Sequence, residues 1–455
     1  MQSKNDFTQG SIPQAVMRLA LPMIGAQIIN ALYSVVDKMY IGRLPDIGAD
    51  ALAGVGITFP FIMIVSAFAM LAGMGGAPLC SIARGEGDID GAEKIMGCSM
   101  AFLLALGVGV TVLSLAIKGP ALYWFGATPE IYAYADQYIS IYLLGSLFVM
   151  MTLGMNPFIN SQGFSRTGMI TVALGAVINI ILDPVFMFAL GMGVRGAALA
   201  TILSQAASAL WVVAFLRGKQ CILRLRREYI RLDKAIIGRV AALGASTCTM
   251  NITESIVSIA CNQTLSIFGD KTYLSVMTVI SSVRQVLMMP VSGFGQGMQP
   301  VMGFNYGAKR YDRVRHCFRF TTVVSAVYAS CVCLATLLFP EFFIRLFNAD
   351  PALVEAGVPA LRLYFCLFFM LSLQMAGQYS FVALGKSRQA TFFSLLRKAF
   401  IVAPMALLLP RFTSLGVMGV FAAEPISDFV GSTACFVTFL LTVWPALKKE
   451  ESLEA

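Results

Sequence analysis

Two polar side chains interrupt an apolar segment, residues 167–189, that is long enough to cross a membrane. Asn179 and Asp183 lie four residues apart, so on a helix they share one face. Pro184 follows directly, and because proline has no N–H, the carbonyl of Ile180 loses its helical partner. These groups form a candidate site for a small cation or a proton. A charge at membrane depth costs roughly 3 kcal/mol or more, which favours a functional site over a structural Asp183 paired with a neighbouring helix.

Another aspartate belongs to the same candidate site. Polar residues recur at steps of three or four along the segment 15–41, namely Gln27, Asn30, Ser34 and Asp37. Oxygen atoms suit a hard cation, and the predicted ligands are Asp37, Asn179, Asp183 and Thr201. Two nearby carboxylates in an apolar medium can instead share one proton, so the sequence leaves Na⁺ and H⁺ open. The main structural alternative is an ion pair between Asp37 and Lys38, whose long side chain can also reach the membrane interface.

Further acids lie in predicted spans of the second half of the chain. They are Glu254, Glu424 and Asp428. Arg397 and Lys398, in another apolar segment, are their predicted charge partners. A structural ion-pair network and a second cation site are equally compatible with this pattern.

The elements that position these residues are membrane-spanning helices. Of the 455 residues, 58% are hydrophobic and 13% are charged, and the mean hydropathy is +0.77, which excludes a soluble globular protein. Apolar runs of about 20 residues follow one another along the chain. They predict an all-α, polytopic membrane protein with twelve spans at residues 15–41, 52–77, 95–117, 131–156, 167–189, 196–216, 236–262, 274–300, 318–340, 355–383, 389–410 and 416–445.

Positive charge is concentrated on one side of the predicted membrane. Most lysines and arginines outside the spans fall in one alternate set of loops and in the termini, and few fall in the other set. The positive-inside rule therefore predicts that both termini lie in the cytoplasm. We expect the protein in the inner (cytoplasmic) membrane of the cell. The net charge of +9 is explained by this topology, and we expect no nucleic-acid partner.

The chain also repeats itself with a shift of 222 residues. That shift carries Gly75 to Gly297, and Tyr142 to Tyr364. A repeat of this kind indicates a duplicated unit of six spans, and an even number of spans gives both copies the same orientation. We therefore predict a lobe at 1–216, a basic cytoplasmic linker at 217–234 and a lobe at 235–455. A pseudo-twofold axis along the membrane normal should relate these two six-helix lobes, an architecture typical of transporters that alternate access to a central cavity.

These features together resemble the multidrug and toxic compound extrusion (MATE) family, and within it the MepA-like branch. The resemblance rests on the duplicated layout of twelve spans and on a few sequence features. These are Pro22, Asp37 within the stretch SVVDKMYIG, Arg84-Gly85, Asn179 and Asp183, and the stretch VRGAALAT, which ends at Thr201. The resemblance implies export of organic, often cationic compounds in exchange for Na⁺ or H⁺. It marks Asp37, Asn179, Asp183 and Thr201 as the coupling site and Glu254 as an acid of the second lobe. Some relatives have a further carboxylate in span 10, where this chain has Gln374 and Gln378.

The cargo cavity is predicted from residue types. Methionine and aromatic side chains suit a promiscuous pocket for organic cations. The candidates, from spans expected near the lobe interface, are Asn30, Tyr33, Tyr142, Met155, Phe158, Tyr364 and Gln374.

Three classes of function remain on the sequence alone. The first is an ion-coupled exporter of small molecules, and the second is a flippase of lipid-linked saccharide on a related fold. The third, a membrane-embedded enzyme, is disfavoured because the chain contains no HExxH or GxSxG motif. We expect a monomer in the lipid bilayer with no cofactor beyond the coupling ion, and no metal beyond Na⁺.

The predicted topology can be tested with an impermeant thiol reagent applied to whole cells. In a background without the native cysteines, single cysteines at Lys118 or Arg411 should react from outside, because both positions fall in the loop set that is poor in positive charge. Cysteines at Arg226 or Arg313 should react only after the membrane is opened. The reverse pattern would overturn the assigned orientation.

Overall fold

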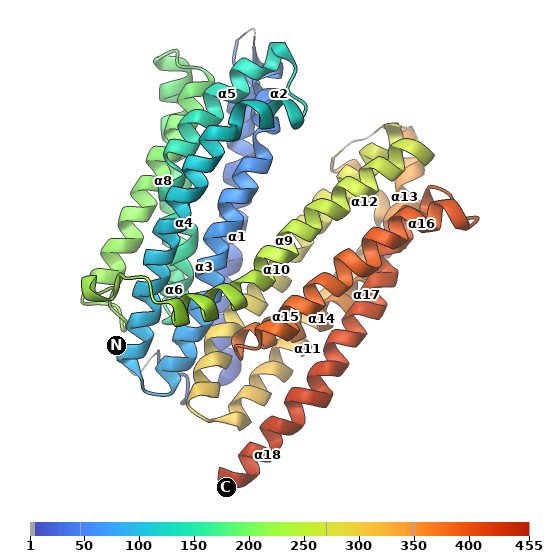
Figure 1. Ribbon diagram of the computed structural model, residues 1–455. Helices are drawn as coiled ribbons and strands as arrows, with labels where there is room; N and C mark the ends of the chain where they lie inside the picture. Colours follow the sequence, from blue (N-terminus) through green and yellow to red (C-terminus); the bar gives the residue numbers. More distant parts are fainter. Residues whose placement is uncertain (1–4, 46, 270, 348–349, 455) are drawn as a thin grey trace. The chain divides into compact units, whose positions relative to one another are not determined.

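Helices make up nearly all of the computed structural model, which describes residues 5–45, 47–269, 271–347 and 350–454 (Figure 1). Within these residues, ten helices are long and apolar enough to cross a membrane. Two further spans are helix pairs, Pro129–Leu144 with Ser146–Ser161 and Pro351–Phe365 with Phe368–Ala383, bent by 56° and 43°. The prediction of an all-α membrane protein with twelve spans is confirmed.

The chain packs as two compact units. Among the described residues, the first unit contains Asn5, Asp6 and the range 25–244, and the second contains the ranges 7–24 and 245–454. The long helices α1 (Ile12–Gly42) and α9 (Lys234–Phe268) therefore each run from one unit into the other. The lobes predicted at 1–216 and 235–455, with their linker at 217–234, stay a prediction.

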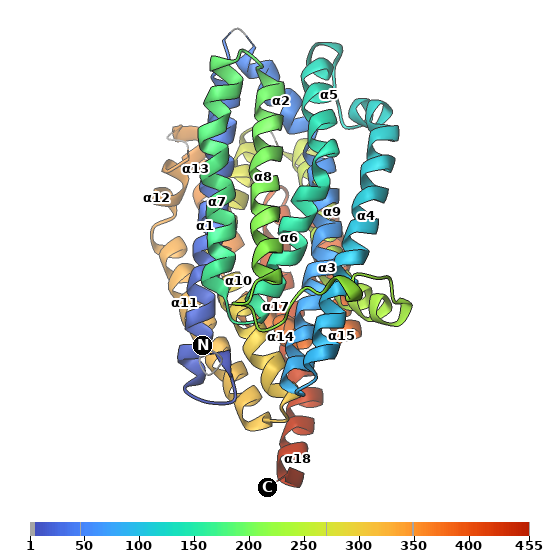
Figure 2. The ribbon, with the colours of Figure 1, turned by 90° about the vertical axis from the view of Figure 1, so that its left-hand side faces the viewer.

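Helices of the first unit run side by side, as α7 and α8 do in Figure 2. Between α1 and α9 its elements are α2 (Gly48–Ile57), α3 (Phe59–Gly85), α4 (Ile89–Trp124), α5 (Pro129–Leu144), α6 (Ser146–Ser161), α7 (Ser165–Pro184), the π-helix η2 (Val185–Ala189), α8 (Val194–Arg217) and the 3₁₀-helix η3 (Arg227–Tyr229).

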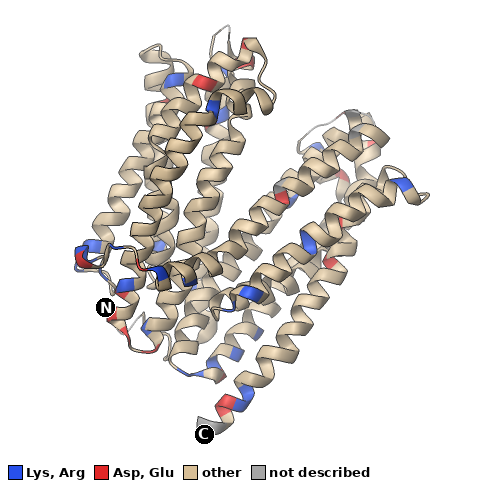
Figure 3. Ribbon diagram, in the orientation of Figure 1, with Lys and Arg blue, Asp and Glu red and all other residues tan. Residues whose placement is uncertain are grey.

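The second unit repeats much of this order. After α9 come α10 (Lys271–Gly307), α11 (Tyr311–Leu338), α12 (Pro340–Arg345), α13 (Pro351–Phe365), α14 (Phe368–Ala383), α15 (Ser387–Leu395), the π-helix η4 (Leu396–Val402), α16 (Ala403–Phe412), α17 (Met418–Thr438), the π-helix η5 (Phe439–Val443) and α18 (Trp444–Glu454). In both units most charged residues lie toward the helix ends, and long stretches between them carry none (Figure 3).

Small residues let the helices of the first unit approach closely. A Cβ atom at Gly73 of α3 would lie 2.6 Å from the carbonyl oxygen of Gly154 on α6. One at Gly75 would lie 2.1 Å from the carbonyl oxygen of Val240 at the start of α9. Contacts this short leave no room for a side chain, so glycine fixes where these helices meet.

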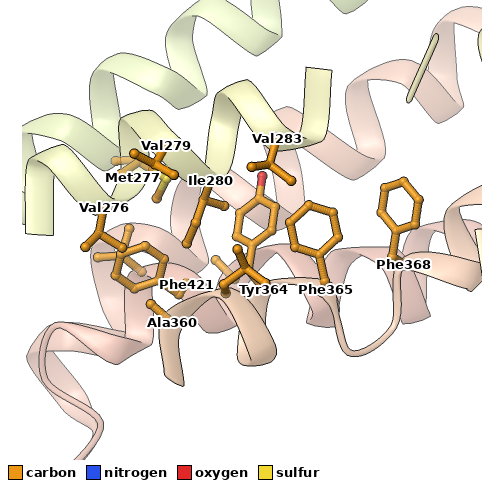
Figure 4. Close-up of a cluster of buried hydrophobic side chains, with 14 of the residues drawn as sticks. Val276, Met277, Val279, Ile280, Val283, Ala360, Tyr364, Phe365, Phe368 and Phe421 are labelled. Carbon is orange, nitrogen blue, oxygen red and sulfur yellow. The ribbon is translucent and has the colours of Figure 1, made fainter. Parts of the chain in front are cut away.

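The core of the second unit is built from aliphatic and aromatic side chains. Val276, Ile280 and Val283 of α10 pack with Tyr364 and Phe365 of α13 (Figure 4). Side chains of this size make many van der Waals contacts when they are buried, and these contacts are the main source of helix association within such a core.

The duplication is visible in the backbone. Four turns that the repeat relates in pairs have the same helix end, in which one residue has positive φ and two hydrogen bonds close the last turn. The positive-φ residues are Gly87, Gly163, Lys309 and Gly385, with φ of 81°, 90°, 57° and 70°. The shift of 222 residues relates Gly87 to Lys309 and Gly163 to Gly385. The predicted repeat therefore extends to the geometry of the turns.

Lys309 gives a test of this geometry, since it is the one non-glycine residue with positive φ among those described. Lys309→Gly should stabilise the protein by about 0.5–1 kcal/mol, because a left-handed conformation strains side chains more than it costs glycine. Gly87→Ala should destabilise it by a similar amount, although no atom lies within 4 Å of the added Cβ. The apparent melting temperature of the purified protein measures both changes, and equal shifts of one sign would contradict the argument.

Candidate functional site

The predicted coupling residues come together inside the first unit. Asp37 is contributed by α1, Asn179 and Asp183 by α7, and Thr201 by α8. Asn179 and Asp183 have no exposed surface, and Asp37 is 9% exposed. The sequence prediction that these four residues form one cluster agrees with this geometry, and their role in ion coupling stays a prediction.

Hydrogen bonds connect the polar groups of this cluster. The carboxyl groups of Asp37 and Asp183 lie close enough to interact, an arrangement that a shared proton or a bound cation would stabilise. With its amide oriented to satisfy both neighbours, Asn179 donates from Nδ2 to Oδ2 of Asp183 at 2.7 Å. Its Oδ1 then accepts from the backbone N–H of Thr201 at 3.2 Å. The amide thereby fixes the position of one carboxylate between α7 and α8.

Tyrosines surround the two carboxyl groups. Tyr33 of α1 and Tyr138 of α5 both interact with the Thr201 hydroxyl, and both lie near Asp37. Tyr138 and Tyr142 stack with their ring centroids 6.1 Å apart. The sequence analysis included Tyr33 and Tyr142 among the cavity candidates but missed Tyr138. Its spacing of four residues from Tyr142 was the available signal.

The predicted alternative of an ion pair between Asp37 and Lys38 does not occur. Lys38 attracts Asp37 electrostatically, but its side chain is exposed and no ion pair joins the two residues. The Oδ1 atom of Asp37 is buried and accepts no hydrogen bond. The cluster therefore offers an unused oxygen acceptor beside a second carboxyl group, which is the kind of site that holds a proton or a hard cation.

Pro184 changes the helix directly after this cluster. The α-helix ends at Pro184 and continues as the π-helix η2. The N–H of Val185 donates to the carbonyl of Leu182, three residues back instead of four. Proline and a π-turn together interrupt the regular hydrogen-bond ladder at the residue next to Asp183, as is frequent at functional sites in helices.

A second polar cluster lies inside the second unit and is joined by ion pairs. Glu424 of α17 contacts Arg284 at 2.6 Å and Lys398 at 3.2 Å, and it also pairs with Arg397. Arg397 contacts Asp428 at 3.0 Å, and Lys398 contacts Glu254 at 3.2 Å. Three acids and three bases therefore balance one another. The Glu254 side chain is 53% exposed, whereas those of Glu424 and Asp428 are almost fully buried.

The predicted pairing of these acids with Arg397 and Lys398 is confirmed. Both bases lie in the π-helix η4, whose wider turn brings two consecutive residues to the same carboxylate. Arg284 of α10 was missed, since a single arginine in an amphipathic stretch gives no sequence signal for its partner. It also donates to the Tyr364 hydroxyl at 2.8 Å. The geometry favours the structural network of the two sequence alternatives, while a second cation site stays a prediction.

The remaining cavity candidates are scattered through the two units. Met155 and Phe158 are buried in α6, where Phe158 fills the space beside Gly76. Gln374 is buried in α14 and its Oε1 accepts from Ser432 at 3.4 Å. Asn30 is exposed on α1. Their roles in binding cargo stay predictions.

Known proteins resemble this chain over nearly its whole length. The sequence model of the MatE family matches residues 22–185 and 247–408. The multidrug export protein MepA of Staphylococcus haemolyticus is 23% identical over 437 residues, covering 96% of this chain and 95% of the relative. MepA of Staphylococcus aureus is 22% identical over 439 residues, with the same coverage.

Solved structures share the fold. A MATE protein in its bent conformation is 23% identical and superposes with a TM-score of 0.92, covering 98% of this chain and 99% of that one. An outward-facing multidrug resistance MATE family transporter, also 23% identical, gives a TM-score of 0.90 and covers 98% of each chain.

Removing the central acid of the ion-pair network should destabilise the second unit strongly. Glu424→Gln leaves three buried basic side chains facing one fewer carboxylate, and losing one member of a buried pair costs about 3–5 kcal/mol. The matched control is Glu341→Gln, which removes the exposed pair with Arg345 and should cost under about 0.5 kcal/mol. Thermal unfolding in detergent compares the variants, and similar melting temperatures would contradict the structural role of the network.

Proposed function

The chain belongs to the MatE family, and from this premise we propose that it is a secondary active multidrug efflux transporter. It exports organic, often cationic compounds in exchange for Na⁺ or H⁺ by alternating access. Relatives named as multidrug export proteins match it along 95% of their length, which supports this cargo class. The proposal includes no catalysis of a covalent reaction and no cofactor beyond the coupling ion.

The observation that carries the coupling proposal is the contact between Asp37 and Asp183. Two buried carboxyl groups lie close to one another, and no ion pair joins either of them to another described residue. Such a pair changes its net charge when it takes up a proton or a cation. The acids of the second unit are already balanced by Arg284, Arg397 and Lys398. The first unit is therefore the better candidate for the coupling ion.

Ion binding can drive export only if it favours one conformation of the transporter over another. In the proposed mechanism, occupancy of the Asp37–Asp183 pair changes how α1 packs on α7 and α8. Pro184 allows α7 to bend next to Asp183, and Pro22 allows α1 to bend about four turns away from Asp37. By thermodynamic reciprocity, cargo must alter the affinity for the ion by the same factor that the ion alters the affinity for cargo.

The proposed setting is the cytoplasmic membrane of a cell, with both termini in the cytoplasm and the protein working as a monomer. Asn30, Tyr33, Tyr142, Met155, Phe158, Tyr364 and Gln374 remain the proposed contacts for cargo. An organic cation would be attracted to aromatic ring faces and to the acidic cluster.

A flippase of lipid-linked saccharide is the alternative on a related fold. An anionic headgroup would need unpaired basic side chains, whereas the three buried bases of the second unit are matched by three acids. This balance favours export of organic cations. Efflux of a cationic dye from cells that overexpress the protein separates the two functions, since a flippase would leave the dye inside.

Neutralising either aspartate should abolish coupling without abolishing cargo binding. Asp37→Asn and Asp183→Asn keep the side-chain shape and remove the charge, so each variant should insert normally, bind dye and lose ion-driven efflux. The double variant should be little worse than either single variant, because residues that act as one unit are not additive. Asp50→Asn, at an exposed position of the same unit, is the matched control and should retain efflux.

Sodium-jump and pH-jump assays in proteoliposomes identify the ion. Only the jump of the coupling ion should drive uptake into inverted vesicles. Concentrative transport by both single variants with unchanged ion dependence would place the coupling site elsewhere, with Glu254 and Glu424 as the next residues to test.

A further inference from the structure

We propose that each half of the chain carries a docking surface for the segment that follows it, and that the opposite charges of the two surfaces assign each segment to its own half. The linker segment, residues 218–233, follows α8 and docks on α4. The C-terminal segment, residues 444–452, follows α17 and η5 and docks on α11. Each docking surface lies within a single unit.

The docking surface on α4 is acidic. Glu93 is 2% exposed; its Oε1 accepts from the backbone N–H of Arg224 at 2.9 Å, and its Oε2 lies 2.6 Å from Nε of Arg226. One turn earlier, Asp90 accepts a hydrogen bond from the Tyr229 hydroxyl. A nearly buried carboxylate that binds both the backbone and a side chain of the linker segment holds this segment in one register.

An aromatic ring completes this surface. A Cβ atom at Gly97 would lie 2.6 Å from the carbonyl oxygen of Tyr229, so the absence of a side chain there makes room for the linker segment. The ammonium of Lys94 and the guanidinium of Arg226 lie 5.6 Å and 5.9 Å from the centre of the Tyr229 ring. Both contacts are within the range of cation–π attraction.

The docking surface on α11 is basic. Arg315 forms an ion pair with Glu451 of the C-terminal segment. The guanidinium groups of Arg315 and Arg319 lie 5.6 Å and 4.9 Å from the Trp444 ring. Phe318 also contacts this ring, with 5.9 Å between the centroids. An aromatic side chain and an ion pair again hold the segment. Here the basic residue belongs to the helix and the acidic residue to the segment, the reverse of the arrangement on α4.

The two surfaces occupy the same register of the repeat. The shift of 222 residues carries Glu93 to Arg315 and Gly97 to Arg319. In both helices these positions are four residues apart and therefore share one face. The duplication has kept both docking positions, and the charge is inverted at the position of Glu93 and Arg315.

The opposite charges of Glu93 and Arg315 distinguish two halves of the chain that are otherwise similar. If the segments were exchanged, Arg226 would meet Arg315 and Glu451 would meet Glu93, and both encounters would bring like charges together. Specific pairing is achieved when the correct partner attracts and the wrong partner repels. We therefore assign Glu93 and Arg315 as the residues that direct each segment to its own helix.

Hydrogen–deuterium exchange of the full-length protein in nanodiscs tests this assignment. Arg315→Glu should raise exchange in residues 444–452 by about tenfold and leave residues 218–233 unchanged, because a docked segment exchanges only after it opens. Glu451→Arg should do the same. The double variant R315E/E451R recreates an ion pair of reversed polarity and should return exchange to within about twofold of the original protein.

The other surface supplies the matched experiment. Glu93→Arg should raise exchange in residues 218–233 alone, and R226E added to it should restore most of the protection. Arg315→Gln and Glu93→Gln are milder substitutes if a reversal prevents folding, and size-exclusion chromatography checks that each variant is monodisperse. Unchanged exchange in the single variants, or no recovery in R315E/E451R, would show that packing alone holds the segments and would overturn the proposal.

Discussion

A charge that leaves water must find a partner, and the polar interior of this protein is arranged around that requirement. In the first unit, Asp37 and Asp183 contact each other, and the amide of Asn179 binds one of them. In the second unit, Glu424 and Asp428 contact basic side chains. Among the described residues no ion pair reaches the two acids of the first unit, whereas each acid of the cluster in the second unit has a basic partner.

The two halves of the chain are related by duplication, yet one contains a pair of acids and the other contains a network of ion pairs. Positions related by the 222-residue shift share turns and helix ends, yet Arg397 and Lys398 correspond to Gly175 and Ala176 in the first half. The local helix differs as well, since Arg397 and Lys398 lie in the π-helix η4 and the related residues lie in the regular α-helix α7. Charge can therefore diverge between the halves while the fold is retained.

The same separation of backbone and charge holds at the docking surfaces of α4 and α11. Glu93 and Arg315 occupy equivalent positions with opposite charge, and each contacts the segment that follows its own half. At these positions a like charge would repel the wrong segment, so the two ion pairs act on which partner is chosen. In the buried clusters and at the docking surfaces alike, the two halves share a fold and differ in the charges that they carry at related positions.

Periodicity and hydropathy are local properties, so the sequence by itself determined the twelve spans, the repeat and the polar stripes that contain Asp37 and Asp183. It also determined that Arg397 and Lys398 would meet acids, because few basic residues lie at that depth. Only the tertiary structure decided that Tyr138 borders the first cluster, that Arg284 joins the second, and that α1 and α9 each belong to both units. These outcomes depend on the rotation and approach of helices distant in the chain, which are set by close contacts such as Gly75 with Val240 and leave no trace in the spacing of residues along one helix.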